Sequence, residues 1–313
     1  MKSKMIAVAV AWVGLTAVAS TFPALDQAHE AFVRGDLNKM VQGIRFVLSQ
    51  DPPESVKKNA IELLESAYAR YPGQNIPSDW KLPVEIRKLK IQQRRVEAGG
   101  DAEYALKVSG NSDQKNRIKQ IQLVKYPNQI VLDKEAKVGE WQESVEDNPA
   151  EGIYFELDGD NREVPATEGL YLLNLVMTSG AKVNGWVILS DITSSRAPRV
   201  QIPLPNETFT TGNPTFRYED FKSPEIKDYE KRSAWLAVIK VDPGTHQYDD
   251  IWKLYTRDLP KTEVTVGKEA DAVGVASLVP GNYRFYATYK EERVFGEVRL
   301  GRQSVTRIPF LVK

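Results

Sequence analysis

The sequence contains no cysteine, which excludes disulfide bonds, thiolate metal sites, cysteine nucleophiles and lipid-modified cysteine anchors. Histidine is nearly as scarce, because His29 and His246 are the only two and fall in different predicted domains. We interpret His29 as a helix-surface residue and His246 as a loop residue, so no two-histidine metal site or serine–histidine couple is expected. Gly-x-Ser-x-Gly, His-Glu-x-x-His and phosphate-cradling glycine motifs are also missing. We therefore expect no catalytic residue, no metal and no cofactor.

An excess of charge of either sign is lacking as well. The 42 basic and 42 acidic residues cancel, which removes the usual electrostatic argument for a nucleic-acid partner. One acidic segment, Asp158-Gly159-Asp160-Asn161, has two carboxylates at calcium-loop spacing, but Arg162 follows where a third oxygen ligand is needed. We interpret this segment as a hairpin turn.

Long apolar runs are lacking after the first twenty residues. Met1-Lys2-Ser3-Lys4 is a short basic head, residues 5–15 are apolar, and small residues at 17–20 allow cleavage near Ala19 or Ser20. The pattern predicts a signal peptide over residues 1–20, and the alternative is an uncleaved membrane anchor. This apolar run is short of the ~20 residues that span a bilayer, which favours the signal peptide. We expect an exported protein, periplasmic or extracellular, with no transmembrane segment in the mature chain.

The segment 21–72 has helical periodicity. Apolar stripes are broken at Gly35-Asp36 and again at Asp51-Pro52-Pro53, which predicts three helices. The Gly-Asp turn and the alanine-rich third stripe resemble a tetratricopeptide-like helical hairpin. Since so few helices cannot bury their own apolar faces, we expect them to pack on another part of the chain. Residues 73–82 are rich in turn formers and are predicted to be a linker.

Residues 83–96 allow two interpretations. A helix would have Pro83 in its first turn and end at Gly99-Gly100, whereas a strand would connect through residues 98–101 to the alternating segment 104–108. We expect the hairpin, because an internal repeat places residues 89–91 opposite 200–202. Further strands are expected at 118–125, 130–132, 153–157, around Tyr171 and Val187, and at 214–218, 235–241, 251–255, 263–266 and 283–289.

The internal repeat has an offset of about 112 residues. The turns Gly169-x-Tyr171 and Gly281-x-Tyr283 match, and segments 183–189 and 294–300 share the pattern Val-x-Gly-x-Val-x-Leu, which predicts a strand in both. We interpret the repeat as a tandem duplication of one module, with the two copies at residues 83–198 and 199–313.

The second copy resembles the fibronectin type III and immunoglobulin-like modules of bacterial envelope proteins. The residues that carry this resemblance are Phe216 and Tyr218 early, Trp252 in the middle, Pro280-Gly281-x-Tyr283 late and Ile308-Pro309-Phe310 last. The resemblance implies two tandem antiparallel β-sandwich domains after the helical segment, in a mostly β chain, and it implies adhesion, spacing or docking roles without supplying functional residues.

Aromatic residues gather in the second module, and an exposed row of them could stack on sugar rings. Tyr248, Trp252 and Tyr286 are the candidates for such a row, and Trp235, Tyr255 and Tyr289 lie nearby; the alternative is that these rings pack in a sandwich core. Paired carboxylates could serve a glycoside hydrolase, but with 42 acidic residues accidental pairs are expected, and none has a distinctive setting.

The two copies differ at outward positions of their late strands. The second has Asn282, Arg284, Glu297 and Arg299, which suit a sheet face in water, and the first has Leu170, Leu172, Trp186 and Ile188. Leaving such side chains in water would forgo roughly 1.5–3 kcal/mol for each large one, so we expect a cover. The helical segment is the favoured cover; the alternatives are a register shifted by one residue and a docking surface for another protein.

These patterns favour an exported, non-catalytic cell-envelope protein that acts as a protein-binding or structural module. The expected partner is a protein of the cell envelope. A carbohydrate-binding adhesin-like module, with a glycan as its ligand, is the second hypothesis, and a secreted hydrolase that uses paired carboxylates is the third.

Overall fold

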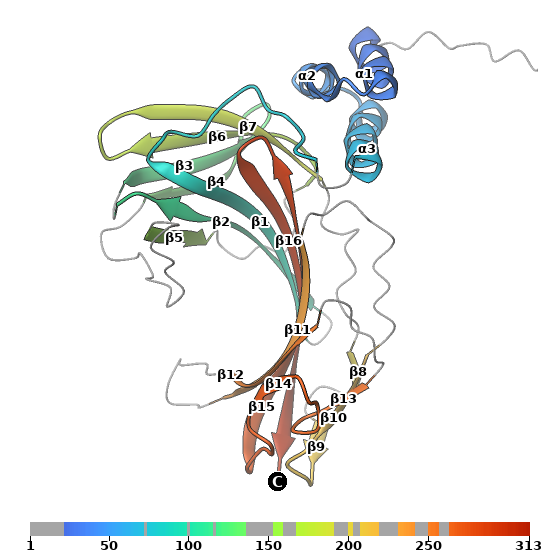
Figure 1. Cartoon of the computed structure of the whole chain (residues 1–313), viewed down its shortest axis with the longest axis vertical. Helices are drawn as coiled ribbons and strands as arrows, with labels where there is room; N and C mark the ends of the chain where they lie inside the picture. Colours follow the sequence, from blue (N-terminus) through green and yellow to red (C-terminus); the bar gives the residue numbers. More distant parts are fainter. Residues whose placement is uncertain are drawn as a thin grey trace, which may run out of the picture.

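The computed structural model describes residues 22–71, 74–98, 101–114, 117–135, 153–158, 167–190, 200–202, 207–218, 231–241, 250–256 and 263–313. The predicted signal peptide, His246 and Tyr248 lie outside these ranges, and so do residues 159–161 of the predicted turn at Asp158. As the sequence predicts, the chain is mostly β, with three helices followed by β-sandwich sheets (Figure 1).

The helices begin and end where the sequence breaks its apolar stripes. They are α1 (Pro23–Arg34), α2 (Leu37–Leu48) and α3 (Glu54–Arg70). Gly35 ends α1 at a φ of 76°, a left-handed conformation that glycine adopts without strain, and Asp36 accepts a hydrogen bond from the Lys39 amide at 3.1 Å as the cap of α2. His29 is exposed on α1. None of the described helices is long and apolar enough to cross a membrane.

The described strands form three sheets. Their bounds are β1 (Ile86–Ala98), β2 (Asp101–Ser112), β3 (Ile118–Lys125), β4 (Gln129–Glu135), β5 (Ile153–Asp158), β6 (Gly169–Met177), β7 (Lys182–Leu189), β8 (Val200–Ile202), β9 (Glu207–Phe209), β10 (Thr215–Tyr218), β11 (Lys231–Lys240), β12 (Asp250–Thr256), β13 (Glu263–Thr265), β14 (Ala272–Gly274), β15 (Gly281–Phe295) and β16 (Val298–Val312). A nine-stranded sheet has the order β14-β12-β11-β15-β16-β1-β2-β5, with β9 paired to β16, and the smaller sheets are β4-β3-β6-β7 and β13-β10-β8. The β1–β2 hairpin confirms the strand interpretation of residues 83–96.

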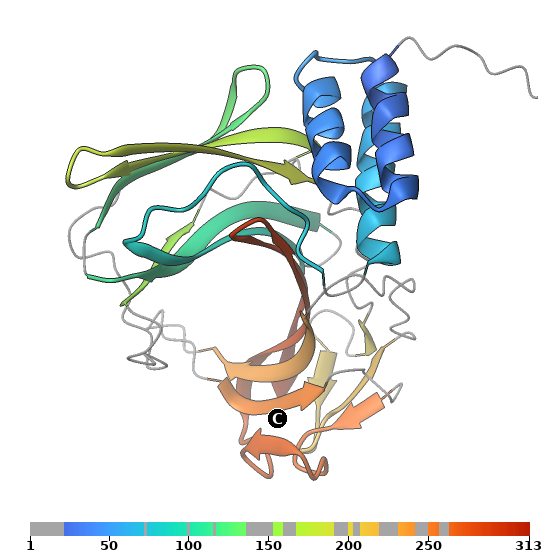
Figure 2. The same ribbon diagram turned by 45° about the horizontal axis from the view of Figure 1, so that its top comes forward.

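The nine-stranded sheet bends along its length, and both smaller sheets pack on its convex side (Figures 1 and 2). Each smaller sheet closes one sandwich over a core of its own. The long strands β15 and β16 serve both: Phe295 and Val298 belong to the first core, whereas Phe285 and Phe310 belong to the second. Strand β1 pairs in parallel with β16, so the sheet itself crosses the boundary predicted at residues 198–199.

The single strand predicted over residues 294–300 is interrupted, because β15 ends at Phe295, residues 296–297 form a hairpin turn and β16 begins at Val298. Phe295 pairs with Val298, and Gly296 between them has a φ of 60°. The Val-x-Gly-x-Val-x-Leu pattern alternates as in a strand, but here its glycine is required by a turn with a positive φ. The matching Gly185 lies inside β7 for another reason, since a Cβ there would come within 2.5 Å of the Trp80 ring.

The earlier part of the repeat has the same local structure in both copies. Gly169 and Gly281 adopt φ values of 147° and 156°, and the hydroxyls of Tyr171 and Tyr283 each donate to the carbonyl four residues upstream. This bond is the tyrosine corner of immunoglobulin-like sandwiches. The copies differ in length, because the β15–β16 hairpin is longer than β6–β7 in both arms.

This difference in length changes which residues correspond. Gly169 pairs with Leu189, whereas Gly281 pairs with Val312. Counting back from these pairs, the counterparts of Trp186 and Ile188 are Pro309 and Leu311, not Glu297 and Arg299 as the sequence pattern suggests. The sequence predicted that Trp186 and Ile188 of the first copy correspond to the charged residues Glu297 and Arg299 of the second. This part of the predicted contrast between the copies is therefore wrong.

The predicted linker is not a free connection, since it holds the β15–β16 turn. Ile76 is fully buried, its carbonyl accepts from the Gly296 amide at 2.7 Å, and it forms a parallel bridge to Phe295. Asn75 donates to the Gly296 carbonyl at 2.7 Å, and the Leu82 amide donates to Glu297 at 2.7 Å. The turn formers of this segment predict a loop, but its apolar residues anchor that loop on the sandwich.

Candidate ligand-binding surfaces

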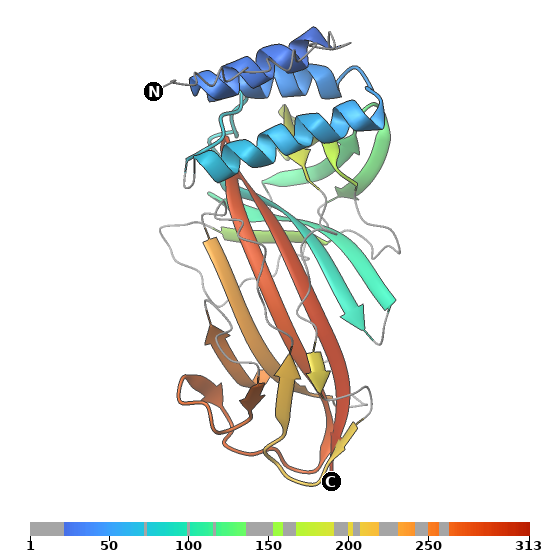
Figure 3. The ribbon, with the colours of Figure 1, turned by 90° about the vertical axis from the view of Figure 1, so that its right-hand side faces the viewer.

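The apolar patch of the first module is buried within the chain. Leu170, Trp186 and Ile188 are at most 4% exposed, and Leu172 packs against them in the cluster that also contains the buried faces of all three helices. Helix α2 lies against β6, and α3 crosses the convex side of the β15–β16 hairpin (Figure 3). These four residues therefore have an intramolecular cover.

Trp186 is the centre of this contact. Its indole Nε1 donates to Asp79, which also forms an ion pair with Arg45 of α2, and the Arg45 guanidinium lies 4.7 Å from the Trp186 ring. Trp80 donates from its indole to the Trp186 carbonyl at 2.8 Å, and Phe295 packs edge-on against the ring at 5.2 Å. Helix α2, the segment after α3, β7 and the β15–β16 hairpin thus meet at one side chain.

The structure divides the aromatic residues of the second module between the two faces of the large sheet. Trp252 is 1% exposed and lies in the second core, so it has no ring face open to a ligand, and Tyr289 is buried as well. Tyr286 is half-buried on the opposite face, together with Trp235 of β11 and the exposed Tyr255 of β12. The aromatic candidates therefore fall into core residues and surface residues by strand parity.

That opposite face is the concave side of the nine-stranded sheet. Side chains alternate along a strand, and the core residues Phe285 and Phe295 place the odd positions of β15 on the convex side. The even positions of β15, and the residues paired with them on neighbouring strands, therefore lie on the concave side. Strands β1, β2, β16, β15, β11 and β12 form this side (Figures 1 and 2).

Cations gather at one part of the concave face. Glu292 forms ion pairs with Lys90, with Lys290 at 3.0 Å and with Arg299 at 3.9 Å, so one carboxylate serves three cations. Burial raises the pKa of Glu292, but the hydrogen bond and charge of Lys90, with Lys290, outweigh it and lower this pKa to about 2. Burial, together with the charge of Lys290, lowers the pKa of Lys90 to about 8.

Gly301 makes this arrangement possible. It lies in β16 between Lys90 on β1 and Glu292 on β15, and a Cβ there would come within 3.0 Å of Lys90 Cε. The Lys90 side chain therefore crosses β16 where that strand has no side chain of its own.

Two further cations on this face have no ion pair among the described residues. Arg94 of β1 lies opposite Gln303, and its Nε is buried without a hydrogen-bond partner in the described part of the chain. Arg307 of β16 lies opposite Tyr286. No sequence pattern marks these cations as one site, because the face they share depends on the parallel pairing of β1 with β16.

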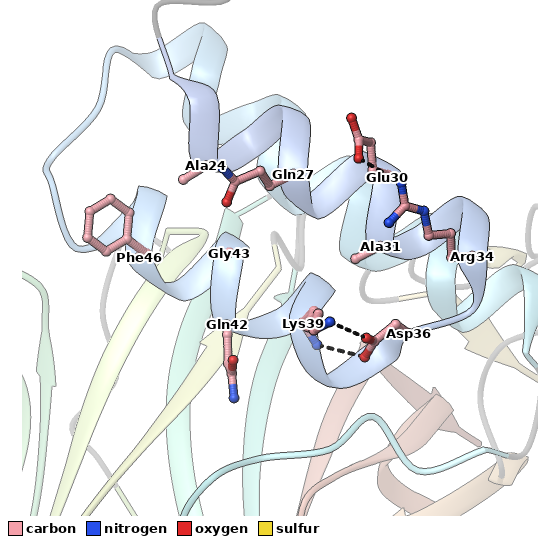
Figure 4. A pocket seen from close by; sticks show the side chains of 10 residues that line it. All are labelled: Ala24, Gln27, Glu30, Ala31, Arg34, Asp36, Lys39, Gln42, Gly43 and Phe46. Atoms are coloured by element: carbon pink, nitrogen blue, oxygen red, sulfur yellow. Dashed lines mark hydrogen bonds and ion pairs between the residues drawn. The ribbon is translucent and has the colours of Figure 1, made fainter.

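The helices carry a second surface, a groove of about 780 Å3 between α1 and α2 (Figure 4). Its base includes Ala24, Ala31 and Gly43, where a Cβ on Gly43 would come within 2.9 Å of the Ala28 methyl group. Phe46 lies at one end of the groove and is 57% exposed. Its charged residues form the pairs Arg34–Glu30 at 3.2 Å and Lys39–Asp36 at 3.6 Å.

In the part of the chain that the structure describes, no group of three or more histidine, aspartate or glutamate side chains could hold a metal ion.

Comparison with solved structures finds matches of low sequence identity and low TM-score. The chain is 9% identical to the fibronectin(III)-like modules of Clostridium thermocellum CbhA, with coverage of 72% of this chain and 94% of that one and a TM-score of 0.19. It is 12% identical to the BSP domain of a biofilm-associated protein, with coverage of 72% and 29% and a TM-score of 0.22. It is 11% identical to a Dpr2 Ig1-Ig2 structure, with coverage of 71% and 94% and a TM-score of 0.24.

No curated protein sequence matches the chain. The model of one family, described as "Protein of unknown function (DUF2861)", matches residues 21–206, which is more than half of the chain. The chain therefore belongs to the DUF2861 family.

Proposed function

We propose that this chain is an exported, non-catalytic protein of the cell envelope that acts as a protein-binding module on a stiff β-sandwich support. The signal-peptide pattern of residues 1–20 and the lack of catalytic motifs support the first two parts. The observation that supports the protein-binding role is the open α1–α2 groove with the exposed Phe46 at one end. A large exposed aromatic ring beside a helical groove favours a protein partner.

The support is stiff because its parts share elements. Strands β15 and β16 pass through both sandwiches, and residues 75–82 bind the turn between these strands. The helices pack on the first sandwich through α2 and α3, so their α1–α2 face is directed away from the sheets (Figure 3). This arrangement suits the presentation of one docking surface at a fixed distance from the second sandwich.

A crosslinking pull-down from envelope extracts tests the proposal. The tagged wild-type protein should enrich a defined protein that the double variant Gln42→Glu/Phe46→Glu loses, since both residues line the groove and Phe46 is 57% exposed. A matched control with two charges on another surface, Lys182→Glu/Lys268→Glu, should retain the partner. An identical set of proteins for all three baits would refute docking at this groove.

Fractionation tests export separately. The mature protein should be found outside the cytoplasm with its N-terminus near Ala19 or Ser20, as N-terminal sequencing would establish. An intact Met1 in a cytoplasmic fraction would contradict export.

A carbohydrate-binding function is the second candidate. The observation in its favour is the group of rings on the concave face, where the centroids of Trp235 and Tyr255 lie 6.5 Å apart and Tyr255 is 61% exposed. Sugar rings present apolar C–H faces that pack on such platforms. Binding of any oligosaccharide, lost on Trp235→Ala/Tyr255→Ala, would support this function.

A further inference from the structure

We propose that the concave face of the nine-stranded sheet binds an acidic polysaccharide chain, with the aromatic rings holding sugar rings and the basic side chains holding their carboxylates. This inference rests on the second candidate function and adds the class of glycan. It does not involve the α1–α2 groove.

The aromatic end of the site lies on β11 and β12. Trp235 and Tyr255 are directly paired across these strands with an interplanar angle of 40°, so together they form a shallow platform and not a stack. Lys253 lies 4.9 Å from the Tyr255 ring and 5.9 Å from the Trp235 ring, and it is held there by Asp250 at 3.0 Å. A positive charge over these rings suits a sugar that carries a carboxylate.

The basic part of the site continues from this platform across the sheet. Tyr286 is a diagonal neighbour of Trp235, and Arg307 lies opposite Tyr286 on the next strand. Beyond β16, Arg94 and then the cluster of Lys90 and its neighbours follow on β1. With strands about 4.8 Å apart, the way from β12 to β1 is roughly 19 Å, which several linked sugar residues would span.

Charge favours an acidic ligand over a neutral one. Of the residues whose side chains the structure describes, strand parity places the cations Lys90, Arg94, Lys107, Lys253, Arg284, Lys290, Arg299 and Arg307 on this face, with the carboxylates Asp101, Glu103, Asp250 and Glu292. Asp250 and Glu292 are already engaged by cations of the same face. Carboxylates of a ligand would supply partners to Arg94 and Arg307, which have none among the described residues.

The shape of the face favours a polymer chain over a membrane surface. Strands β1 and β12 carry Lys90 and Lys253, and β16 between them carries Arg307. A sheet that curves inward cannot lay these three strands on one flat anionic bilayer (Figures 1 and 2). A flexible glycan chain can follow the curvature, and the rings at one end supply the contacts that a purely electrostatic site would lack. We therefore assign the face to a polysaccharide, and other polyanions become outcomes of the test.

The test is a titration of the purified full chain with four probes of similar length: a polygalacturonate oligomer, a neutral dextran oligomer, poly-L-glutamate and oligo-dT. We expect binding of polygalacturonate that weakens with salt. Two variants, Arg94→Glu/Arg307→Glu and Trp235→Ala/Tyr255→Ala, should each weaken it at least tenfold. The control Lys182→Glu/Lys268→Glu makes the same change of charge at exposed positions away from the face and should bind like the wild type.

The outcomes separate the two levels of the proposal. Equal binding of dextran would overturn the acidic specificity and leave the carbohydrate function standing, whereas no binding of either glycan would overturn both. Poly-L-glutamate or oligo-dT binding as tightly as polygalacturonate, without loss on Trp235→Ala/Tyr255→Ala, would overturn the assignment to a glycan. The milder Arg94→Gln/Arg307→Gln variant, checked by circular dichroism, keeps the test valid if the glutamate variant does not fold.

Discussion

Glu65 of α3 forms an ion pair with Arg293 of β15, with 2.8 Å between the carboxylate Oε1 and the guanidinium Nη1. Arg302 of β16 lies 3.4 Å from the same oxygen, and both guanidiniums donate to the hydroxyl of Ser190. The Arg293 group also lies 4.1 Å from the Tyr68 ring. This cluster lies on the convex side of the β15–β16 hairpin, between the hairpin residues of the first core and those of the second. Helix α3 is therefore bound to the part of the hairpin that joins the two sandwiches.

Replacing Glu65 should destabilise the protein strongly. Arg293 and Arg302 are nearly buried, and Glu65→Gln leaves their charges without the carboxylate, which costs about 3 kcal/mol when a buried pair loses one partner. Denaturant unfolding measures this loss. Glu62→Gln on the same helix is the control, because its ion pair with Lys58 is exposed and is worth less than about 0.5 kcal/mol. Equal effects of the two substitutions would mean that the cluster does not support the fold.

Acid should remove part of the stability through two carboxylates. Burial raises the pKa of Glu65, but Arg293 and Arg302 outweigh it and hold this pKa below its ordinary value of 4.5, and the pKa of Glu292 is about 2. Because a depressed pKa in the folded state stabilises above the unfolded value, this contribution is complete above about pH 4.5 and is lost as the pH falls towards 2. The melting temperature of the wild type should therefore fall over this window. A Glu65→Gln/Glu292→Gln variant should show a flatter dependence, and an unchanged slope would contradict the assignment.

Sequence patterns predicted local structure better than the connection between the modules. The three helices, the β1–β2 hairpin and most strands follow from apolar periodicity and from turn residues, which act over a few positions. The turn at Gly296 was not predicted, because its flanking residues alternate like a strand. Without this turn, the sequence could not predict the longer β15–β16 hairpin or the correct counterparts of Trp186 and Ile188. The parallel pairing of β1 with β16 joins residues more than 200 positions apart, and no local pattern predicts it.

The same limit applies to the candidate sites. Aromatic residues are frequent in the sequence of the second module, but the sequence alone could not assign them to a face, and Trp252 is a core residue. Arg94 and Arg307 are ordinary alternating polar residues within their own strands. They become one surface only when β1 and β16 are adjacent.

The turn at Gly296 should tolerate no side chain. In Gly296→Ala the Cβ would lie 1.9 Å from Ser78 Oγ, and the φ of 60° disfavours alanine, so we expect a loss of about 2 kcal/mol or more in unfolding free energy. Gly180 is the matched control, since its φ is 86° but a Cβ there meets nothing within 4 Å. Gly180→Ala should cost only the backbone strain, about 1 kcal/mol. A smaller loss at Gly296 than at Gly180 would show that residues 75–82 do not hold the turn.

Binding of an acidic ligand to the concave face should weaken as the pH rises through about 8. Lys90 has a pKa of about 8 because burial and Lys290 disfavour its charge, and Glu292, Lys290 and Arg299 are the charged groups around it. A ligand carboxylate binds the protonated form, so affinity for polygalacturonate should fall severalfold between pH 7 and 9. Lys90→Arg keeps its charge over this range and should remove most of the dependence. A profile that is the same in both proteins would exclude Lys90 from the site.

Deleting residues 24–75 should expose the apolar patch of the first sandwich. The deletion removes all three helices, so Trp186 loses Arg45, Leu170 and Ile188 lose their cover, and Arg293 and Arg302 lose Glu65. The remaining chain should bind a hydrophobic dye and aggregate, as measured by dye fluorescence and light scattering. A shorter deletion of residues 24–48 retains α3 with Glu65, so it should expose less apolar surface and give an intermediate dye signal. A soluble, dye-negative product of the long deletion would show that the patch closes without the helices.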